Sequence, residues 1–357
     1  MNKLTIIIPF ILSTPLSQAI LIDEHTFKEN GGDITDVRQG LKNKNEKLRE
    51  LSYAKEYLSV GAIPGCTATW IGNDDKNKWS YILTAAHCVD YANTKTSTKS
   101  SFTSWNNKVI ADGEGTSFVP KERINRPAGM GGASTDIAIL KLPFRAVLTD
   151  ANGKPVVKPV LNDSSDEMNE TVTYVGYGTW GVGLNQHGSY WPEKGDRRLF
   201  GQSKIDSIFE LDYGIGASYS PVGPSEFWAR VAPGDSGSSW WQKKNSRNVI
   251  IATTNGHGGS YSTGARVSKY KDWIKSVYPE ALFLSELKDL PEKYDHSFPE
   301  NLRTYKAGTV ILQPRDGKLY ECKPFPYSGF CVQWSRSSNQ FEPGVGSNWQ
   351  DAWKLKN

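Results

Sequence analysis

An all-β fold is predicted for the greater part of this 357-residue chain. Between about residues 51 and 280, short runs rich in Val, Ile, Thr, Tyr and Trp alternate with clusters of Gly, Asn, Asp and Ser. Short β-prone runs separated by turn-forming residues are typical of a β-sandwich or β-barrel. One segment departs from this pattern: Val267 to Tyr278 carries apolar and aromatic residues at helical spacing, which predicts a helix at the end of this part.

Length and charge narrow the classes of function. The chain is long enough for two domains, and its formal net charge is only +4, with basic and acidic residues interspersed. A nucleic-acid-binding surface needs clustered Lys and Arg, so we expect no nucleic-acid partner. His and Cys do not cluster with the spacing of metal ligands, so we expect no metal ion, and we expect a monomer without a cofactor.

The first 19 residues have the pattern of a secretory signal peptide. A lysine precedes an apolar run from Leu4 to Leu16, and the small residues Ser17 and Ala19 occupy the positions expected before a cleavage site. The run is too short to span a bilayer, and no later segment is long and apolar enough to be a membrane helix. We therefore expect a secreted, extracellular protein with no membrane partner.

Residues 20–50 are polar and charged, which is the composition of a propeptide or a loosely held N-terminal arm. Removal of the signal peptide would leave Ile20 as the first residue. Two routes of maturation remain open: signal cleavage itself gives the final N-terminus, or a second cut follows Arg38.

The four cysteines fit an exported protein. Cys66 and Cys88 lie in one half of the chain, whereas Cys322 and Cys331 lie near its end. Four cysteines allow three connectivities, and this distribution favours the two local pairs, Cys66–Cys88 and Cys322–Cys331. Disulfides are the expected state in an oxidising compartment.

Three polar residues in the β-rich part have the chemistry of a nucleophilic hydrolase. Ser236 lies between two glycines in RVAPGDSGSSWW, a predicted turn before an apolar strand. A serine hydroxyl needs a base to accept its proton, and the base needs an acid to orient it. His87 follows the apolar run WSYILTAA, and Asp136 opens the strand DIAILKL. A carboxylate there can hold one imidazole nitrogen while the other nitrogen takes the serine proton.

Taken together, these segments resemble the chymotrypsin-like serine proteases. The motifs TAAHC, DIAIL and GDSGS occur in the order His, Asp, Ser. In addition, VGYGT is similar to a strand that these enzymes carry between the acid and the serine, and GARVSKYKDWI is similar to their last strand and terminal helix. The resemblance covers residues 51–280, and three motifs in order are far more specific than any one of them.

This resemblance implies two six-stranded antiparallel β-barrels with a catalytic triad in the cleft between them. His87 would be the general base and then the acid, Asp136 its orienting partner, and Ser236 the nucleophile that forms an acyl-enzyme with protein or peptide substrates. The backbone N–H groups of Gly234 and Ser236 would form the oxyanion hole. In the family, the residue at Asp235 commonly pairs with a newly freed N-terminal amine.

The expected substrate pocket departs from the trypsin-like pattern. Arg230 stands six residues before Ser236, where trypsin-like enzymes carry an aspartate. A cation there would repel Lys and Arg side chains and could pair with an acidic one, so we do not expect cleavage after basic residues. Thr254 and Gly256 belong to the expected pocket wall, and His257 follows it. The alternative is that Arg230 faces solvent or a structural partner.

The end of the chain has a different character. Residues 281–303 are polar and bounded by prolines, which predicts a linker, and residues 304–357 are rich in aromatic residues, Gly and Pro. So small a domain relies on a disulfide for stability. Its segments YECKPFPYSGFCVQW and FEPGVGSNWQDAWK resemble the small chitin-binding modules of bacterial chitinases and chitin-binding adhesins.

This second resemblance implies a short twisted β-sheet with a surface strip of aromatic rings. Trp349 and Trp353 would stack on sugar rings, with Trp334 and Tyr327 behind them, although most of the rings could instead form the small core. Tyr320 is equally suited to that core. Chitin, other N-acetylglucosamine-containing glycans or mucin-like glycoproteins would be the targets.

A secreted serine endopeptidase tethered to a glycan is the function that these observations favour, because a tether raises the local enzyme concentration. One alternative is a glycan-binding adhesin whose protease-like part is only a scaffold. Another is a polysaccharide hydrolase, but the paired carboxylates that it needs are not evident in the sequence.

Overall fold

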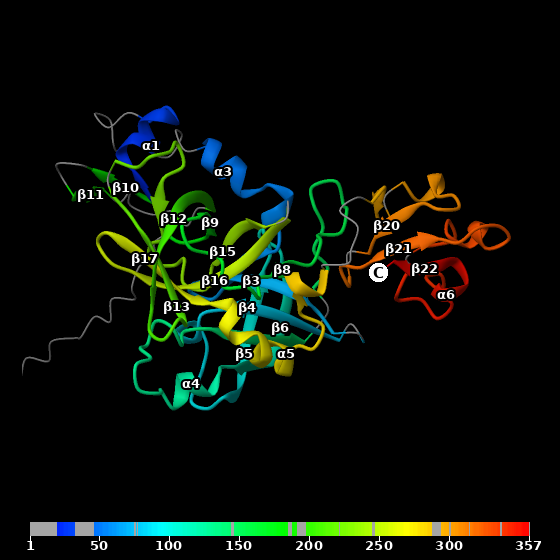
Figure 1. Ribbon diagram of the computed structural model, residues 1–357, viewed down its shortest axis with the longest axis horizontal. Helices are drawn as coiled ribbons and strands as arrows, with labels where there is room; N and C mark the ends of the chain where they lie inside the picture. Colours follow the sequence, from blue (N-terminus) through cyan, green and yellow to red (C-terminus); the bar gives the residue numbers. More distant parts are fainter. Residues whose placement is uncertain are drawn as a thin grey trace, which may run out of the picture.

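The computed structural model describes residues 20–32, 46–74, 76, 78–143, 146–184, 188–190, 198–220, 222–244, 247–287, 294–299, 301–313, 315–335 and 338–356. Strands dominate these residues and form two closed six-stranded antiparallel barrels and two four-stranded sheets (Figure 1). The all-β prediction with two barrels is therefore confirmed. None of the helices within the described ranges has the length and apolar character needed to cross a bilayer.

The first barrel closes in the order β2-β3-β4-β7-β6-β5. Its strands are β2 (Val60–Ile63), β3 (Cys66–Asn73), β4 (Trp79–Thr84), β5 (Lys95–Thr103), β6 (Val109–Phe118) and β7 (Ala138–Pro143). Trp70, Phe102 and Leu140 lie in its core. Closure brings β2 very near β5, since a Cβ added to Gly61 would lie 2.2 Å from the Thr103 carbonyl oxygen. Glycine is the residue that permits this approach.

The second barrel closes through the pairing of β15 with β16. Its strands are β9 (Thr171–Gly176), β12 (Leu199–Phe209), β13 (Gly214–Ser218), β15 (Ser239–Lys244), β16 (Arg247–His257) and β17 (Tyr261–Arg266). Two short strands, β8 (Val160–Leu161) and β18 (Leu282–Phe283), extend the sheet beyond β16 with parallel pairing. Tyr174 and Trp240 pack edge to face in the core, with ring centroids 5.1 Å apart.

The first described residues belong to the fold, which corrects part of the expectation of a loosely held arm. Strand β1 (Leu21–Asp23) pairs with β10 (Gly181–Leu184) on one side and with β14 (Ala229–Arg230) on the other. Ile20 is fully buried beside it. The signal peptide expected at 1–19 and the alternative processing site at Arg38 lie outside the described residues.

Short helices and one further strand complete this part of the chain. Strand β11 (Gly188–Tyr190) pairs with β10. The helices are α1 (Glu24–Glu29), α3 (Glu46–Ser52), α4 (Lys121–Ile124), η1 (Lys55–Tyr57) and η2 (Ala86–Cys88). The Asp23 carboxylate caps α1 by accepting the Thr26 backbone N–H at 2.9 Å. Such a cap satisfies an N–H group that has no partner within the helix.

The helix predicted at Val267 to Tyr278 is present but begins differently. Its first turn is the 3₁₀ segment η3 (Val267–Tyr270), and α5 (Lys271–Val277) continues from it. β18 and η4 (Leu284–Leu287) follow, and their buried Phe283 and Leu287 belong to the large hydrophobic core that joins the two barrels. Residues 282–287, which were expected to belong to the linker at 281–303, are therefore part of the folded core.

The C-terminal residues form a separate small sheet, drawn from orange to red at one end of the molecule in Figure 1. Its strands are β19 (His296–Ser297), β20 (Val310–Leu312), β21 (Leu319–Cys322) and β22 (Trp353–Lys356). The helices here are α6 (Trp349–Ala352), η5 (Leu302–Thr304) and η6 (Tyr327–Phe330). Phe298, Phe341 and Trp353 contribute to a core of its own.

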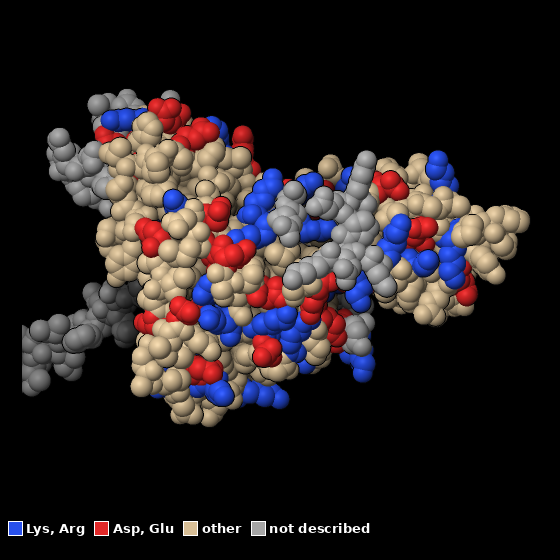
Figure 2. Space-filling model, in the orientation of Figure 1, with Lys and Arg blue, Asp and Glu red and all other residues tan. Residues whose placement is uncertain are grey.

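The face of the molecule drawn in Figure 2 carries basic and acidic side chains interspersed, in keeping with the small net charge. The disulfides Cys66–Cys88 and Cys322–Cys331 join the two local pairs that the sequence favours. The first lies in the first barrel, and the second lies in the C-terminal sheet.

Candidate active site

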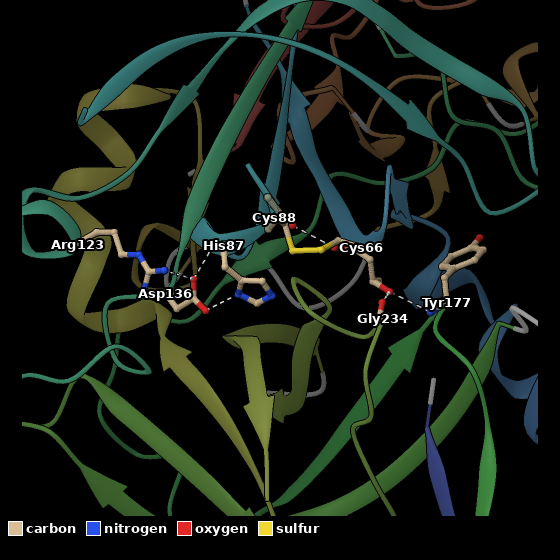
Figure 3. The surroundings of a disulfide bond; sticks show 9 residues. Cys66, His87, Cys88, Arg123, Asp136, Tyr177 and Gly234 are labelled. Atoms are coloured by element: carbon tan, nitrogen blue, oxygen red, sulfur yellow. Dashed lines mark hydrogen bonds and ion pairs between the residues drawn. A yellow bond between two sulfur atoms is a disulfide. The ribbon is translucent and has the colours of Figure 1, made fainter. Parts of the chain in front are cut away.

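His87 and Asp136 lie together at one end of the first barrel (Figure 3). His87 lies in η2, directly after β4, and Asp136 lies just before β7. Because β4 and β7 are antiparallel neighbours, the residue after one and the residue before the other meet at the same end of the barrel. The His87 Nδ1 atom is 2.6 Å from Asp136 Oδ2, and the His87 backbone N–H donates to Asp136 Oδ1 at 2.9 Å. The carboxylate thus fixes both the ring and the main chain of His87.

Arg123 is a third member of this cluster, and sequence reasoning missed it. Its Nη2 atom is 3.6 Å from Asp136 Oδ1 (Figure 3). Its Nη1 donates to the Gly132 carbonyl oxygen at 3.0 Å, and the guanidinium lies over the Tyr91 ring at 4.6 Å. Arg123 is mostly buried, so its charge acts on the carboxylate with little screening by water. No motif marks Arg123, because α4 meets Asp136 only in the folded chain.

The turn that carries Ser236 is fastened beside the His87 segment. The Cys66–Cys88 disulfide joins the start of β3 to the residue after His87. The next residue of β3, Thr67, donates its backbone N–H to the Ser236 carbonyl oxygen at 3.0 Å and its hydroxyl to the Gly234 carbonyl oxygen at 2.9 Å. The disulfide and these two hydrogen bonds connect the segments that carry the predicted base and the predicted nucleophile.

Two glycines give this turn its shape. Gly234 has φ of 93° and Gly237 has φ of 82°, values at which any other residue would be strained. A Cβ added to Gly237 would lie 2.1 Å from Oγ1 of Thr84, the last residue of β4. The turn therefore packs directly against the segment that leads to His87. Among the described residues, no hydrogen bond joins the His87 ring to the Ser236 hydroxyl.

A cleft of about 610 Å³ opens beside His87. Its lining includes His87, Arg123, Arg126 and Asp136, together with residues of β16 and β17, namely Asn255, Gly256, His257, Tyr261 and Thr263. The sulfur atoms of Cys66 and Cys88 also lie close to the His87 ring. Because they are bonded to each other, they offer no thiolate to a metal ion.

The family model described as Trypsin matches residues 56–274, more than half of the chain. The chain belongs to the trypsin family. Two solved structures are similar to it. A Glu endopeptidase in complex with MPD is 18% identical with a TM-score of 0.41, covering 64% of this chain and 94% of that chain. Neuropsin, a serine protease of mouse brain, is 17% identical with a TM-score of 0.42, covering 62% and 95%.

A second group of relatives matches a short part of the chain. GlcNAc-binding protein A of Photobacterium profundum is 61% identical over 71 residues, which are 20% of this chain and 14% of that protein. The protein of the same name from Shewanella oneidensis is 51% identical over 72 residues, which are 20% of this chain and 15% of that protein. The chain thus spans about a seventh of the length of these relatives.

In the trypsin-family domain, Asp235 is buried behind the serine turn. Its carboxylate accepts the Ala232 N–H at 3.0 Å and the Gly178 N–H at 3.4 Å. Burial raises the pKa of the Asp235 carboxyl to about 7. The space around it is tight, since a Cβ added to Gly176 would lie 1.8 Å from one carboxylate oxygen. Asp235 is thus a constrained acid whose charged form is costly.

Arg230 is buried, so the expectation that it could face solvent was wrong. The side chain is only 6% exposed, and its guanidinium lies 5.7 Å from the centre of the Tyr219 ring. Nη1 donates to the Val231 carbonyl oxygen at 2.8 Å, and burial lowers the pKa of this guanidinium. Among the described residues, the Arg230 Nε atom has no hydrogen-bond partner. Arg230 lies outside the lining of the cleft beside His87.

The other expected pocket residues separate into two kinds. Gly256 and His257 line the cleft. Thr254 does not: it is buried, its hydroxyl lies 2.6 Å from the Ser238 hydroxyl, and it accepts the Trp240 indole N–H at 2.8 Å. Thr254 therefore holds the serine turn to the second barrel, and its assignment to the pocket surface was wrong.

Among the expected glycan-binding residues, Trp353 is placed in the core. It is 1% exposed and donates its indole N–H to the Phe341 carbonyl oxygen, so its assignment as a stacking ring was wrong. Trp349 is half-buried, with its ring edge to face against Tyr320. Trp334 is also half-buried; it packs against Phe298 and donates its indole N–H to Glu342.

Two neighbouring rings lie on the surface of the C-terminal sheet instead. Tyr327 is 46% exposed, and Phe325, which the sequence analysis did not single out, is 88% exposed. Both lie in the loop closed by the Cys322–Cys331 disulfide. The Pro-aromatic spacing of KPFPYSGF is the sequence signal that could have found Phe325.

Proposed function

We propose that this chain is a secreted serine endopeptidase that uses His87, Asp136 and Ser236 as a catalytic triad. The observation that carries the proposal is the contact between His87 Nδ1 and Asp136 Oδ2. A carboxylate beside Nδ1 accepts a hydrogen bond from the Nδ1–H group. The Nε2 atom then carries no proton and can act as the base. The packing of the serine turn against the end of β4 supports the same arrangement.

In this mechanism, the Ser236 hydroxyl oxygen attacks the carbonyl carbon of the substrate while His87 Nε2 takes the hydroxyl proton. Asp136 stabilises the imidazolium that forms. The N–H groups of Gly234 and Ser236 donate to the oxyanion. The C–N bond then breaks, His87 gives its proton to the leaving amine, and an acyl-enzyme remains on Ser236. Water, activated by His87, hydrolyses this ester and restores the hydroxyl.

Covalent labelling of the serine tests this proposal. A fluorophosphonate probe should label the secreted, purified full-length protein once, at Ser236, and stop its hydrolysis of a mixed peptide library. Ser236→Ala should abolish both, whereas Ser218→Ala, which removes an exposed serine hydroxyl at the end of β13, should change neither. An unlabelled wild-type protein that hydrolyses no peptide would favour the adhesin alternative.

We also propose that the C-terminal residues 304–357 bind N-acetylglucosamine-containing glycans and hold the protease near proteins embedded in them. The exposed rings of Phe325 and Tyr327 support this, and a stretch of 71 residues of this chain is similar to GlcNAc-binding protein A. Apolar faces of pyranose rings pack on such flat surfaces, and a tether raises the local concentration of the enzyme.

Sedimentation with chitin beads tests the glycan proposal. The double variant Phe325→Ala with Tyr327→Ala should lose most of the bound fraction. Tyr261→Ala removes a ring of similar exposure, 49%, from the trypsin-family domain and should bind as the wild type does. Binding of the double variant equal to that of the wild type would show that Phe325 and Tyr327 do not form the glycan-binding face.

A further inference from the structure

The cleft beside His87 contains a cation that has no counterion among the residues that the structure describes. Arg126 lines it and is exposed, and no ion pair of Arg126 is present among the described residues. Its terminal nitrogens lie 3.9 Å from the position that a Cβ on Gly132 would occupy, which places the guanidinium against the cleft wall. A guanidinium in this position presents paired N–H donors to whatever enters the cleft.

The acidic side chain that lines the cleft, Asp136, already faces a cation. Asp136 receives hydrogen bonds from His87 and faces Arg123, so its negative charge is shared between two groups. Glu210 is not among the lining residues; it lies near Gly131 and accepts the Ser134 N–H at 2.8 Å. Arg126 is therefore the uncompensated charge among the described lining residues.

Residues of β16 also line the cleft, and hydrogen bonds hold Asn255 in place. Asn255 donates its side-chain N–H to the Ala133 carbonyl oxygen and accepts the Thr263 hydroxyl, which ties β16 to the wall that carries Arg126. Burial and the nearby Arg230 cation lower the pKa of His257. A lowered pKa favours the uncharged imidazole over the imidazolium.

We infer that this cleft is a subsite for an acidic side chain of the substrate, with Arg126 as its specificity-determining residue. The inference rests on the proposed endopeptidase function and names its substrate class: peptides with Asp or Glu near the scissile bond. A carboxylate and a guanidinium form a charge-assisted, bidentate pair, and a substrate Lys or Arg at the same position meets Arg126 as a like charge.

The inference is tested with pairs of internally quenched peptides. The two peptides of a pair differ only in having Glu or Gln at one position, and that position is varied from P4 to P3′. We expect kcat/KM to be about two- to fivefold higher for the Glu peptide at one position, which is the range that an exposed ion pair supports. In Arg126→Gln this ratio should fall to about one, and high salt should reduce it in the wild type. Lys121→Gln removes an exposed cation of α4 that does not line the cleft and should keep the wild-type ratio.

Two results would overturn the inference. Ratios near one at every position, in a wild-type protein that is labelled at Ser236 and cleaves peptides, would refute the acidic subsite and leave the proposed function standing. An acidic preference that survives Arg126→Gln would refute the role of Arg126. Absence of both labelling and cleavage would refute the proposed function and the inference together.

Discussion

Replacing Asp235 by Asn tests the free-energy cost of the buried carboxylate behind the serine turn. Burial raises the pKa of this group from its usual 3.8 to about 7 in the folded chain. Between these two values the unfolded chain has released the proton and the folded chain still holds it. The free energy of unfolding therefore falls as the pH rises through this window, and the loss is complete above pH 7.

The size of this effect follows from the shift. One pKa unit corresponds to about 1.4 kcal/mol, so a shift from 3.8 to about 7 gives roughly 4 kcal/mol. An Asn side chain does not titrate, so any packing penalty that it brings is the same at every pH. The difference in the free energy of unfolding, wild type minus Asp235→Asn, should thus decrease by roughly 4 kcal/mol between pH 4 and pH 8.

Urea unfolding followed by tryptophan fluorescence, at half-unit steps of pH, measures this difference. The protein should carry residues N-terminal to Ile20, so that no free amine is created at Ile20. A difference that stays constant from pH 4 to pH 8 would refute the reasoning, because it would mean that Asp235 titrates normally. In a chain that begins at Ile20, we expect the pH dependence of this difference to weaken, since the family resemblance implies that the free N-terminal amine lies near the Asp235 carboxylate.

Three further predictions concern other parts of the molecule. Arg123→Gln should lower kcat/KM of peptide cleavage by about five- to tenfold, because the Asp136 carboxylate loses a mostly buried cation. Arg123→Lys should recover part of this loss. A Gln variant with the kcat/KM of the wild type would show that Arg123 does not support Asp136. Replacing both Cys66 and Cys88 by Ser opens a crosslink of sequence separation 22 and should lower the free energy of unfolding by about 3 kcal/mol in urea, whereas an unchanged midpoint would contradict the crosslink. Trp353→Ala should lower the free energy of unfolding of the C-terminal sheet by about 3–5 kcal/mol, and the near-UV circular dichroism signal of that sheet should be lost. Phe325→Ala should leave the spectrum unchanged. The reverse result would mean that Phe325, and not Trp353, is the core residue.

The sequence predicted those features whose signal is local. His87 and Asp136 could be found because each lies at the end of an apolar strand within a short motif. The disulfide pairs followed from their spacing along the chain. The two barrels required the family resemblance, because alternating strands and turns are compatible with either a barrel or a sandwich.

Other features depend on contacts between distant segments. The strand at Leu21–Asp23 has three residues, too few to show a period, and it is buried only because β10 and β14 flank it. Arg123 reaches Asp136 from another element. Trp353 and Phe325 are both aromatic, and only the folded sheet decides that Trp353 lies inside and Phe325 outside.

The most direct test of the central claim is to trap the acyl-enzyme. The full-length protein is mixed with an activated ester, quenched in acid, digested and examined by mass spectrometry. The account predicts one acyl group on the peptide that contains Ser236, and its loss in His87→Ala. No adduct, or an adduct on a different residue, would contradict the assignment of Ser236 and His87 as nucleophile and base.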